Sequence, residues 1–313
     1  MDEMISQLQR ENRMATADNY RRTRRSFESF LQHSARKEVD IRRVDAGLLA
    51  DYAEWLSVGG CHANTVAFHM RYLRAAYNRA LKTGITAIPA AGHPFLHVST
   101  LPTPTTKRAA SADIIKALCR LDIRAQLMAT GRSSNRKTFQ KTLDDLTFAR
   151  DIFLFCFYAC GMPFVDVAYL TRDNLREGRL CYRRHKTQRY IKMEILPQMQ
   201  HLIDRYASQG PYLFPILCSL SCKEAYRQYL KALRKFNHKL DMLSDLLGLG
   251  VRLTSYVARH SWATTVYHHN MPVAYICERM GHTTEQTTRN YLKSFESSKI
   301  DEMNKRILSQ IML

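Results

Sequence analysis

The chain has 313 residues, of which 45% are hydrophobic, and this length predicts a globular protein of two domains. Lysine and arginine number 47 against 28 aspartate and glutamate residues, which gives a formal net charge of +19. The excess is spread along the chain, which excludes a single basic tail and favours a polyanionic partner such as nucleic acid. Charge alone leaves a ribosome-associated or simply basic protein open.

The cysteines and the N-terminus bear on the cellular compartment. None of the eight cysteines forms a C-x-x-C pair, and several lie in apolar runs such as "IFLFCFYAC", so we expect reduced, mostly buried thiols in a cytoplasmic protein. The first residues lack the apolar core of a secretion signal. No run of about 18 apolar residues predicts a membrane span.

The sequence predicts no metal and no other cofactor. His268 and His269 are neighbours on a predicted helix, so their side chains point apart. Cys218 and Cys222 have no partner ligands at zinc-site spacing, and we interpret them as core thiols.

Three amphipathic helices are predicted in the first 90 residues, where no strand pattern occurs. They cover residues 15–33, 45–58 and 62–85, where Gly59 and Gly60 end the second helix and Gly84 stops the third. Residues 1–95 therefore predict a helical domain. Residues 96–110 contain two prolines and a Lys-Arg pair, which is typical of an extended basic linker.

Residues 111–313 predict a second, mixed domain. Ser111 is expected to cap a helix, residues 122–142 are polar and predict a loop, and 144–162 is apolar almost all round, which indicates a buried helix. Residues 178–196 alternate and are rich in β-formers, so they predict a hairpin.

The hairpin is expected to turn between His185 and Gln188, and helices follow from Met199 to the C-terminus. One of them, residues 285–292, begins after the helix-stopping Gly281. The last helix is amphipathic and ends in apolar residues, which is typical of a segment that docks on its own chain or on a neighbouring subunit.

Five side chains in the second domain fit one chemistry: Tyr256 and Arg259 in "TSYVARHSWATT", Lys186 in "RRHKTQR", and His282 and Tyr291 in "MGHTTEQTTRNYL". A tyrosine oxygen can attack a phosphodiester and hold the strand as a phosphotyrosine ester. Arginine and histidine donors stabilise the charge that develops on the phosphate oxygens. A lysine on a hairpin can protonate the departing 5′ oxygen.

Each of these residues also has an ordinary interpretation. Tyr291 is one of 16 tyrosines and alone would be a packing residue. His282 alone would be a polar group at a helix end, Arg259 a surface ion-pair partner, and Lys186 one of several cations that face phosphate. The order and the spacing of the motifs decide between the two interpretations.

The run "ARHSWATT", the 23 residues from Arg259 to His282 and the nine from there to Tyr291 in "GHTTEQTTRNYL" resemble the tyrosine recombinase (phage integrase) family, in its branch with F-V-D after the first-arginine motif. The resemblance implies a mainly α fold. A helical core-binding (SAM-like) domain would cover residues 1–95, and a linker would follow at 96–110. An α+β catalytic domain with a small antiparallel sheet and a C-terminal docking helix would cover 111–313.

The resemblance also implies roles for the candidate residues. Tyr291 would be the nucleophile, Arg259 the second arginine of the site, His282 the conserved histidine and Lys186 the hairpin lysine. Tyr256 stands where the family usually has histidine, and its hydroxyl can still donate to a phosphate oxygen. The family works without metal or ATP, as a homotetramer on double-stranded DNA whose protomers often exchange the C-terminal helix.

The first arginine of the family is missing. In "YACGMPFVDVAYL" the corresponding position is Pro163 in one register and Cys160 in the other, and neither is a cation. We hypothesise that Cys160 occupies the lost position. Either a nearby arginine substitutes for it, Arg150 or Arg172, or the activity is reduced.

In the first domain, "RRTRR" predicts phosphate contacts by Arg21, Arg22, Arg24 and Arg25. The start of the third helix predicts entry into a major groove by Asn64, Thr65 and His69.

Three functions remain open on the sequence. The first is a site-specific DNA recombinase that cuts and rejoins DNA. The second is a weakened or inactive recombinase-fold protein that binds recombination sites. The third is a type IB topoisomerase that relaxes supercoils by the same tyrosine chemistry.

Overall fold

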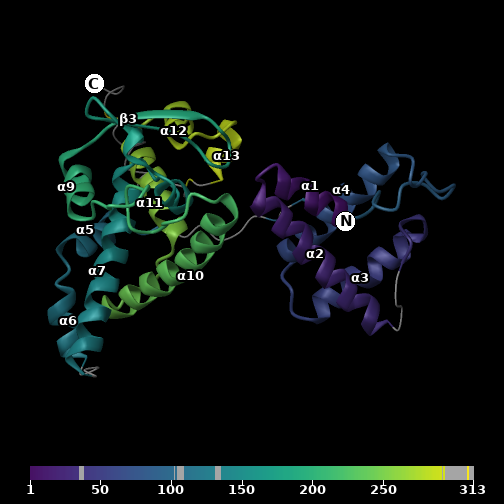
Figure 1. Cartoon of the computed structure of the whole chain (residues 1–313), viewed down its shortest axis with the longest axis horizontal. Coiled ribbons are helices and arrows are strands. Elements are labelled where there is room, and N and C mark those ends of the chain that lie inside the picture. The colour runs from purple at the N-terminus through teal and green to yellow at the C-terminus, as the bar shows by residue number, and fades with distance from the viewer. Residues whose placement is uncertain are drawn as a thin grey trace. The chain divides into compact units, whose positions relative to one another are not determined.

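The computed structural model describes residues 1–34, 39–101, 103, 109–130, 135–290, 292 and 309. The chain packs as two units, Met1–Thr105 and Thr106–Leu313, each with its own hydrophobic core (Figure 1). Within the described residues no helix is long and apolar enough to cross a membrane.

The first unit is helical, as the sequence predicts. Its elements are α1 (Asp2–Arg10), α2 (Met14–His33), the short 3-10 helix η1 (Ile41–Arg43), α3 (Ala46–Val58) and α4 (Ala63–Lys82). The apolar faces of α2, α3 and α4 meet in one core, whose largest members are Phe30, Leu49, Tyr52, Met70, Tyr77 and Phe95.

Local signals fix the ends of these helices. The side chain of Asp45 accepts a hydrogen bond from the amide of Leu48 at 2.7 Å and so caps α3. The helix α1 is absent from the sequence prediction because nine residues are too few to form a stable helix alone. Packing supplies the missing free energy, since Ile5 and Leu8 are buried against Tyr20 and Ala76.

The second unit contains nine α-helices among its described residues, with the short 3-10 helix η2 (Arg172–Asn174) and three strands. The helices are α5 (Ala112–Arg120), α6 (Ile123–Ala129), α7 (Arg136–Tyr158), α8 (Phe164–Ala168), α9 (Pro197–Arg205), α10 (Cys222–Leu246), α11 (Ser255–His268), α12 (Val273–Met280) and α13 (Glu285–Arg289).

The helix α7 is the centre of this unit. It packs against α5, α6, α9, α10 and α11 (Figure 1), which is why its second half is apolar on every side. The predicted loop over 122–142 is wrong, because this stretch contains α6 and the beginning of α7, capped by the side chains of Asp122 and Asn135. Single buried residues such as Leu127 anchor these otherwise polar turns, and this signal is too sparse to detect by composition.

The strands β1 (Leu175–Arg176), β2 (Arg179–Arg183) and β3 (Tyr190–Glu194) form an antiparallel sheet in the order β1-β2-β3. The predicted hairpin and its turn are confirmed, while β1 is an addition. Leu180 and Tyr182 are buried on β2, and the alternation of a strand places Arg184 in register with them. The mainly α fold with a helical first domain and an α+β second domain is confirmed.

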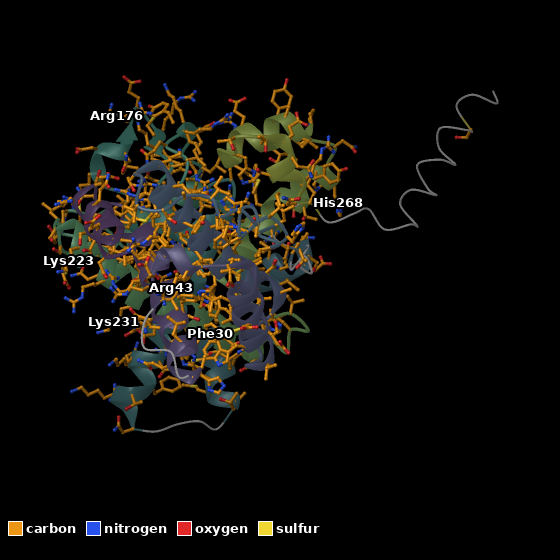
Figure 2. The ribbon with its side chains drawn as sticks, turned by 90° about the vertical axis from the view of Figure 1, so that its right-hand side faces the viewer. Phe30, Arg43, Arg176, Lys223, Lys231 and His268 are labelled. Carbon is orange, nitrogen blue, oxygen red and sulfur yellow. The ribbon has the colours of Figure 1, made fainter. Side chains whose placement is uncertain are left out.

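Two other predictions need correction or lie outside the described residues. All eight cysteines are free, but only Cys156, Cys181 and Cys277 are buried. Cys218 and Cys222 are exposed, so they are not core thiols. The predicted C-terminal docking helix lies outside the described residues, as does most of the linker. Charged side chains on the surface of the second unit include Arg176, Lys223 and Lys231 (Figure 2).

Candidate active site

Arg259 and His282 meet inside the second unit. Arg259 lies on α11 with 3% of its surface exposed, and His282 follows α12 with 5% exposed. Nη2 of Arg259 is 2.8 Å from Nε2 of His282, and the guanidinium also donates to the carbonyl oxygens of Gly161 and Met280, each at 2.6 Å. The folded chain thus holds a buried guanidinium on fixed carbonyls, in contact with an imidazole.

The state of the His282 ring follows from two of its contacts. A guanidinium only donates, so Nε2 accepts, and Nδ1 carries the proton and donates it to Oγ1 of Thr288 at 2.9 Å. Burial, and after it the positive charges of Arg259, Arg184, Lys186 and Arg189, together lower the pKa of His282 to about 3. The imidazole is therefore neutral at the pH of a cell.

Gly281 makes the turn that delivers His282. It ends α12 in the left-handed conformation, with φ at +61°, where a side chain would be strained. A Cβ atom there would also come within 2.9 Å of Cγ of Arg184 and of Cδ1 of Ile191. The glycine is required both for the turn and for the close approach of the hairpin.

The loop after α7 contacts Arg259 as well. A Cβ atom on Gly161 would lie 3.1 Å from Cα of Arg259, so glycine lets this loop touch α11. Cys160 has a φ of +56°, and it packs on the apolar cluster that contains Trp262 and Met280. Burial raises the pKa of its thiol, so the residue adds no charge to the site.

Arg184 and Asp166 also lie at this site, although the sequence motifs did not predict them. Arg184 follows β2 and is 5% exposed, and its Nη1 donates to the carbonyl oxygen of Met280 that Arg259 also contacts. Oδ2 of Asp166 lies 3.0 Å from Nε of Arg184, and Oδ1 accepts the amide of His185 at 2.8 Å. The period of two along the strand, which places residues 180, 182 and 184 on one face, could have indicated that Arg184 points inward.

The remaining predicted catalytic residues are placed as follows. Lys186 is exposed in the hairpin turn, near enough to His282 to affect its pKa. Tyr256 is 54% exposed at the start of α11, whereas Arg259 is buried. The Tyr256 side chain is therefore largely in solvent and the Arg259 side chain is inside the unit. Tyr291 lies outside the described residues.

The residues that flank position 291 in the sequence do contact the site. Thr288 is buried and bonds the ring of His282, and Leu292 is buried in the apolar cluster of Trp262, Ile276 and Met280. Thr288 and Leu292 are therefore packed against His282 and against the apolar side chains of α11 and α12.

The two arginines considered as substitutes lie elsewhere. Arg150 pairs with Asp151 at 2.8 Å and donates to the carbonyl oxygen of Leu121, and Arg172 donates to the carbonyl oxygen of Ser208. Neither has a described contact with Arg259 or its carbonyl partners, so neither is brought to the site.

The predicted DNA contacts of the first unit differ in their surroundings. Arg21 and Arg22 pair with Asp18, and Arg24 pairs with Asp2 and Glu28. Arg25 and Thr65 are exposed.

Two further candidates are engaged inside the unit. Asn64 exchanges hydrogen bonds with the backbone of Thr103 at 2.7 and 3.0 Å. His69 is buried, and its Nδ1 lies 3.2 Å from Oγ1 of Thr23. A ring packed in this way does not reach a base edge, so the prediction for His69 needs correction.

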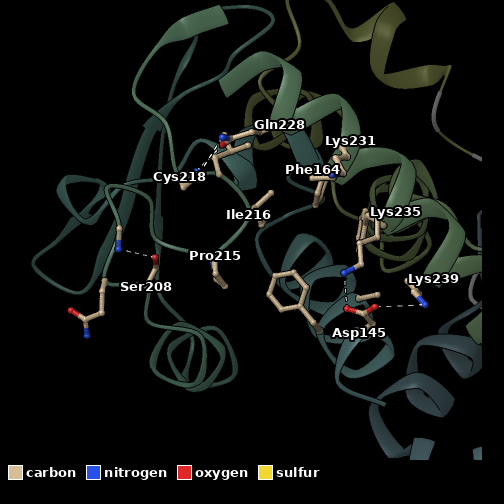
Figure 3. A pocket seen from close by; sticks show the side chains of 17 residues that line it. Asp145, Phe164, Ser208, Pro215, Ile216, Cys218, Gln228, Lys231, Lys235 and Lys239 are labelled. Atoms are coloured by element: carbon tan, nitrogen blue, oxygen red, sulfur yellow. Dashed lines mark hydrogen bonds and ion pairs between the residues drawn. The ribbon is translucent and has the colours of Figure 1, made fainter. Parts of the chain in front are cut away.

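A hollow of about 710 Å³ lies between α7, α10 and the loop at residues 208–218. Figure 3 shows apolar Phe164, Pro215 and Ile216 around it, while Asp145 binds Lys235 at 2.6 Å and Lys239 at 3.7 Å at its edge. None of the candidate catalytic residues lines this hollow. Among the described residues, no group of histidine, cysteine, aspartate or glutamate side chains could hold a metal ion.

The fold is that of solved tyrosine recombinases. The XerH site-specific recombinase bound to palindromic difH substrate matches with a TM-score of 0.59 at 15% identity, covering 96% of this chain and 83% of that one. A lambda integrase dimer bound to a COC' core site matches with a TM-score of 0.56 at 14% identity, covering 91% and 94%.

Two protein-family models match the amino-acid sequence of this chain. The model described as phage integrase family matches residues 137–298, and the phage integrase SAM-like domain matches residues 1–91. The chain belongs to the phage integrase family.

A curated relative supports this membership. Tyrosine recombinase XerC of Rickettsia peacockii is 27% identical over 141 residues, which are 44% of this chain and 44% of the relative. The matched stretch thus spans less than half of the relative's length.

Proposed function

We propose that this protein is a site-specific DNA recombinase of the integrase type, which cuts and rejoins DNA through a 3′-phosphotyrosine intermediate. One observation carries the proposal: Arg259 and neutral His282 are buried in contact at 2.8 Å, in a family whose sequence motifs pair them with a following tyrosine. A buried guanidinium held on two carbonyl groups is already oriented to bind a phosphate.

Each predicted residue has its own role in the proposed reaction. The oxygen of Tyr291 attacks the phosphorus and forms the phosphotyrosine bond, while the bond from phosphorus to the 5′ oxygen breaks. Arg259 donates to the phosphate oxygens as negative charge develops on them. Lys186, exposed on the hairpin, gives the leaving 5′ oxygen its proton. Religation is the reverse, so the reaction needs no ATP.

Neutral His282 is suited to a supporting role. Its Nδ1 proton is engaged by Thr288, and its Nε2 atom accepts from Arg259, so the ring fixes the guanidinium. Tyr256, which is 54% exposed, stands where the family usually has histidine, and its hydroxyl would donate to a phosphate oxygen.

The assembly and the branch of the family belong to the same proposal. Two DNA duplexes have four strands, and each of four protomers would cut one of them. The apolar C-terminal helix would dock on a neighbouring protomer. A solved relative, lambda integrase, is a tetramer on a Holliday junction, at a TM-score of 0.53. We also propose that the chain belongs to the branch whose first arginine precedes the glycine, which the F-V-D motif at residues 164–166 supports. The reaction would occur in the cytoplasm, where the sequence predicts the protein to be.

The first unit would bind the core DNA site. Exposed Arg25 and Thr65 are the strongest candidates, because the other basic residues of α2 already pair with carboxylates. Replacing Arg25 with glutamine should weaken binding to all duplexes alike, whereas replacing Thr65 should alter the preference among sequences.

The test is a covalent adduct on a nicked suicide duplex that carries the recombination site. Wild-type protein should form an adduct that survives denaturing electrophoresis, and Tyr291→Phe should form none. Tyr275→Phe, at an exposed tyrosine of α12, is the matched control and should behave as wild type. An adduct in Tyr291→Phe would contradict the proposal.

One alternative has an observation in its favour. Neither Cys160 nor Pro163 is a cation, and a site without its first arginine could serve a protein that binds recombination sites without cutting them. Site-specific binding with no adduct on any duplex would establish this function. Relaxation of supercoiled DNA regardless of sequence would instead indicate a topoisomerase.

A further inference from the structure

We infer that Arg184 is a catalytic residue that supplies a second guanidinium to the scissile phosphate, in place of the cation that Cys160 and Pro163 do not provide, and that Asp166 is the positioning residue that holds it there. The inference rests on the proposed function and names a residue for the same site.

The first step is the placement of Arg184. Its Nη1 and Nη2 of Arg259 donate to one oxygen, the carbonyl of Met280. Two donors on one oxygen lie within about 6 Å of each other, twice an ordinary N–O distance. The two guanidinium groups are buried to a similar degree, 5% and 3% exposed, although they come from a hairpin and from α11. Two guanidinium groups at this separation can bind one phosphate together.

The second step concerns the donors that remain. Nη1 of Arg184 is engaged by Met280, and Nε faces Oδ2 of Asp166 at 3.0 Å. Among the described residues Nη2 of Arg184 has no hydrogen-bond partner. A buried arginine whose Nη2 atom is free to donate, beside a second guanidinium, is suited to bind an anion.

The third step is the role of Asp166. It lies on α8, six residues after Cys160, and is itself buried. Its two oxygens engage Nε of Arg184 and the amide of His185, so it fixes both the side chain and the backbone at the turn of the hairpin. The helix α8 therefore follows Cys160, where the first arginine is missing, and carries the carboxylate that pairs with Arg184.

The fourth step is electrostatic. Burial raises the pKa of Asp166, and the charges of Arg184 and Arg259 together with the amide of His185 act in the opposite direction. The charge of Arg184 is also one of the causes that lower the pKa of His282. The charge of Arg184 therefore lies near both Asp166 and His282.

The experiment separates cleavage from folding and from DNA binding. Removing Arg184 alone would leave the carboxylate of Asp166 buried without its partner, so the main variant is the neutral pair Asp166→Asn with Arg184→Gln. We expect this double variant to bind the nicked suicide duplex within about threefold of wild type and to form the covalent adduct at least 100-fold more slowly in a single turnover.

Single variants complete the design. Asp166→Asn alone keeps the guanidinium of Arg184 but removes the ion pair that positions it. This variant should form the adduct roughly tenfold more slowly, with unchanged duplex affinity. Arg183→Gln is the matched control, since this neighbouring arginine is exposed on the other face of β2, and it should cleave at the wild-type rate once the duplex is saturated.

The outcomes distinguish the two proposals. If wild type forms the adduct and the folded neutral-pair variant forms it equally fast, the role of Arg184 is wrong and the proposed function stands. If slower cleavage is matched by an equal loss of duplex affinity, Arg184 only binds DNA and the inference also fails. If wild type forms no adduct, both proposals fail.

Discussion

Nη2 of Arg259 lies 2.8 Å from Nε2 of His282, although the two residues are 23 positions apart in the chain. The contact exists because α12 ends at Gly281, whose left-handed conformation turns the chain back toward α11. An arginine that is held by carbonyl groups and an imidazole loses little freedom when it binds a phosphate. This relationship gives four predictions.

The first prediction concerns Arg259. Replacement by lysine keeps the charge but removes the planar fork of donors, so the contacts to Gly161, Met280 and His282 cannot all be made. We expect single-turnover adduct formation to fall by about 10²- to 10³-fold. The rate on a nicked suicide duplex measures this. Arg176→Lys, at an exposed arginine of β1, is the control, and equal rates in both variants would contradict the prediction.

The second prediction is a pH dependence of stability. The pKa of His282 is lowered to about 3 in the folded protein, while the unfolded chain has the ordinary value near 6.5. Between these values the unfolded state binds a proton that the folded state does not, so this residue makes the free energy of unfolding fall as the pH falls below about 6.5. Its contribution is fully present above that pH.

Denaturant unfolding at several pH values between 5 and 7.5 checks this prediction. His282→Gln should show a shallower loss of stability toward low pH than wild type, because it lacks the titrating ring. Coincident slopes in the two proteins would show that the ring is not held neutral by the fold.

The third prediction concerns Gly281. An alanine there would be strained at a φ of +61°, and its Cβ would lie 2.9 Å from atoms of Arg184 and Ile191. We expect Gly281→Ala to lower the free energy of unfolding by about 2–4 kcal/mol, from backbone strain and overpacking together. Thermal or denaturant unfolding measures it.

Gly84→Ala is the matched control for that change. Gly84 also has a left-handed backbone, with φ at +71°, but no described atom lies within 4 Å of its added Cβ. This variant should therefore lose only about 1–2 kcal/mol. Equal losses in the two variants would mean that the contact with Arg184 is not tight.

The fourth prediction tests whether Cys160 occupies the position of the family's first arginine. If Cys160 occupies the first-arginine position, Cys160→Arg should raise the rate of adduct formation, by roughly tenfold. Because Arg184 lies at the same site, the gain should be larger in the neutral-pair variant of Asp166 and Arg184 than in wild type. An unchanged or lower rate in Cys160→Arg would exclude this assignment of Cys160.

Local sequence patterns were sufficient for most of the elements. The apolar periodicity of residues 62–85 and the alternation of 178–196 predicted α4 and the hairpin, and both are present. The pattern failed over residues 122–142, where α6 and the first turns of α7 lie although Ile123 and Leu127 are the only buried residues among those described there. Short helices of this kind form by packing against the rest of the domain, and a single sequence does not show that packing.

The sequence by itself determined the candidate catalytic set, because the spacing of Arg259, His282 and Tyr291 is a linear property of the chain. Only the tertiary structure decided which other groups join it. Arg184 and Asp166 lie 75 and 93 positions before Arg259, and no local pattern relates them to it. Arg184 meets Arg259 on the carbonyl group of Met280, and Asp166 pairs with Arg184, through long-range contacts that depend on how the hairpin, α8, α11 and α12 pack together.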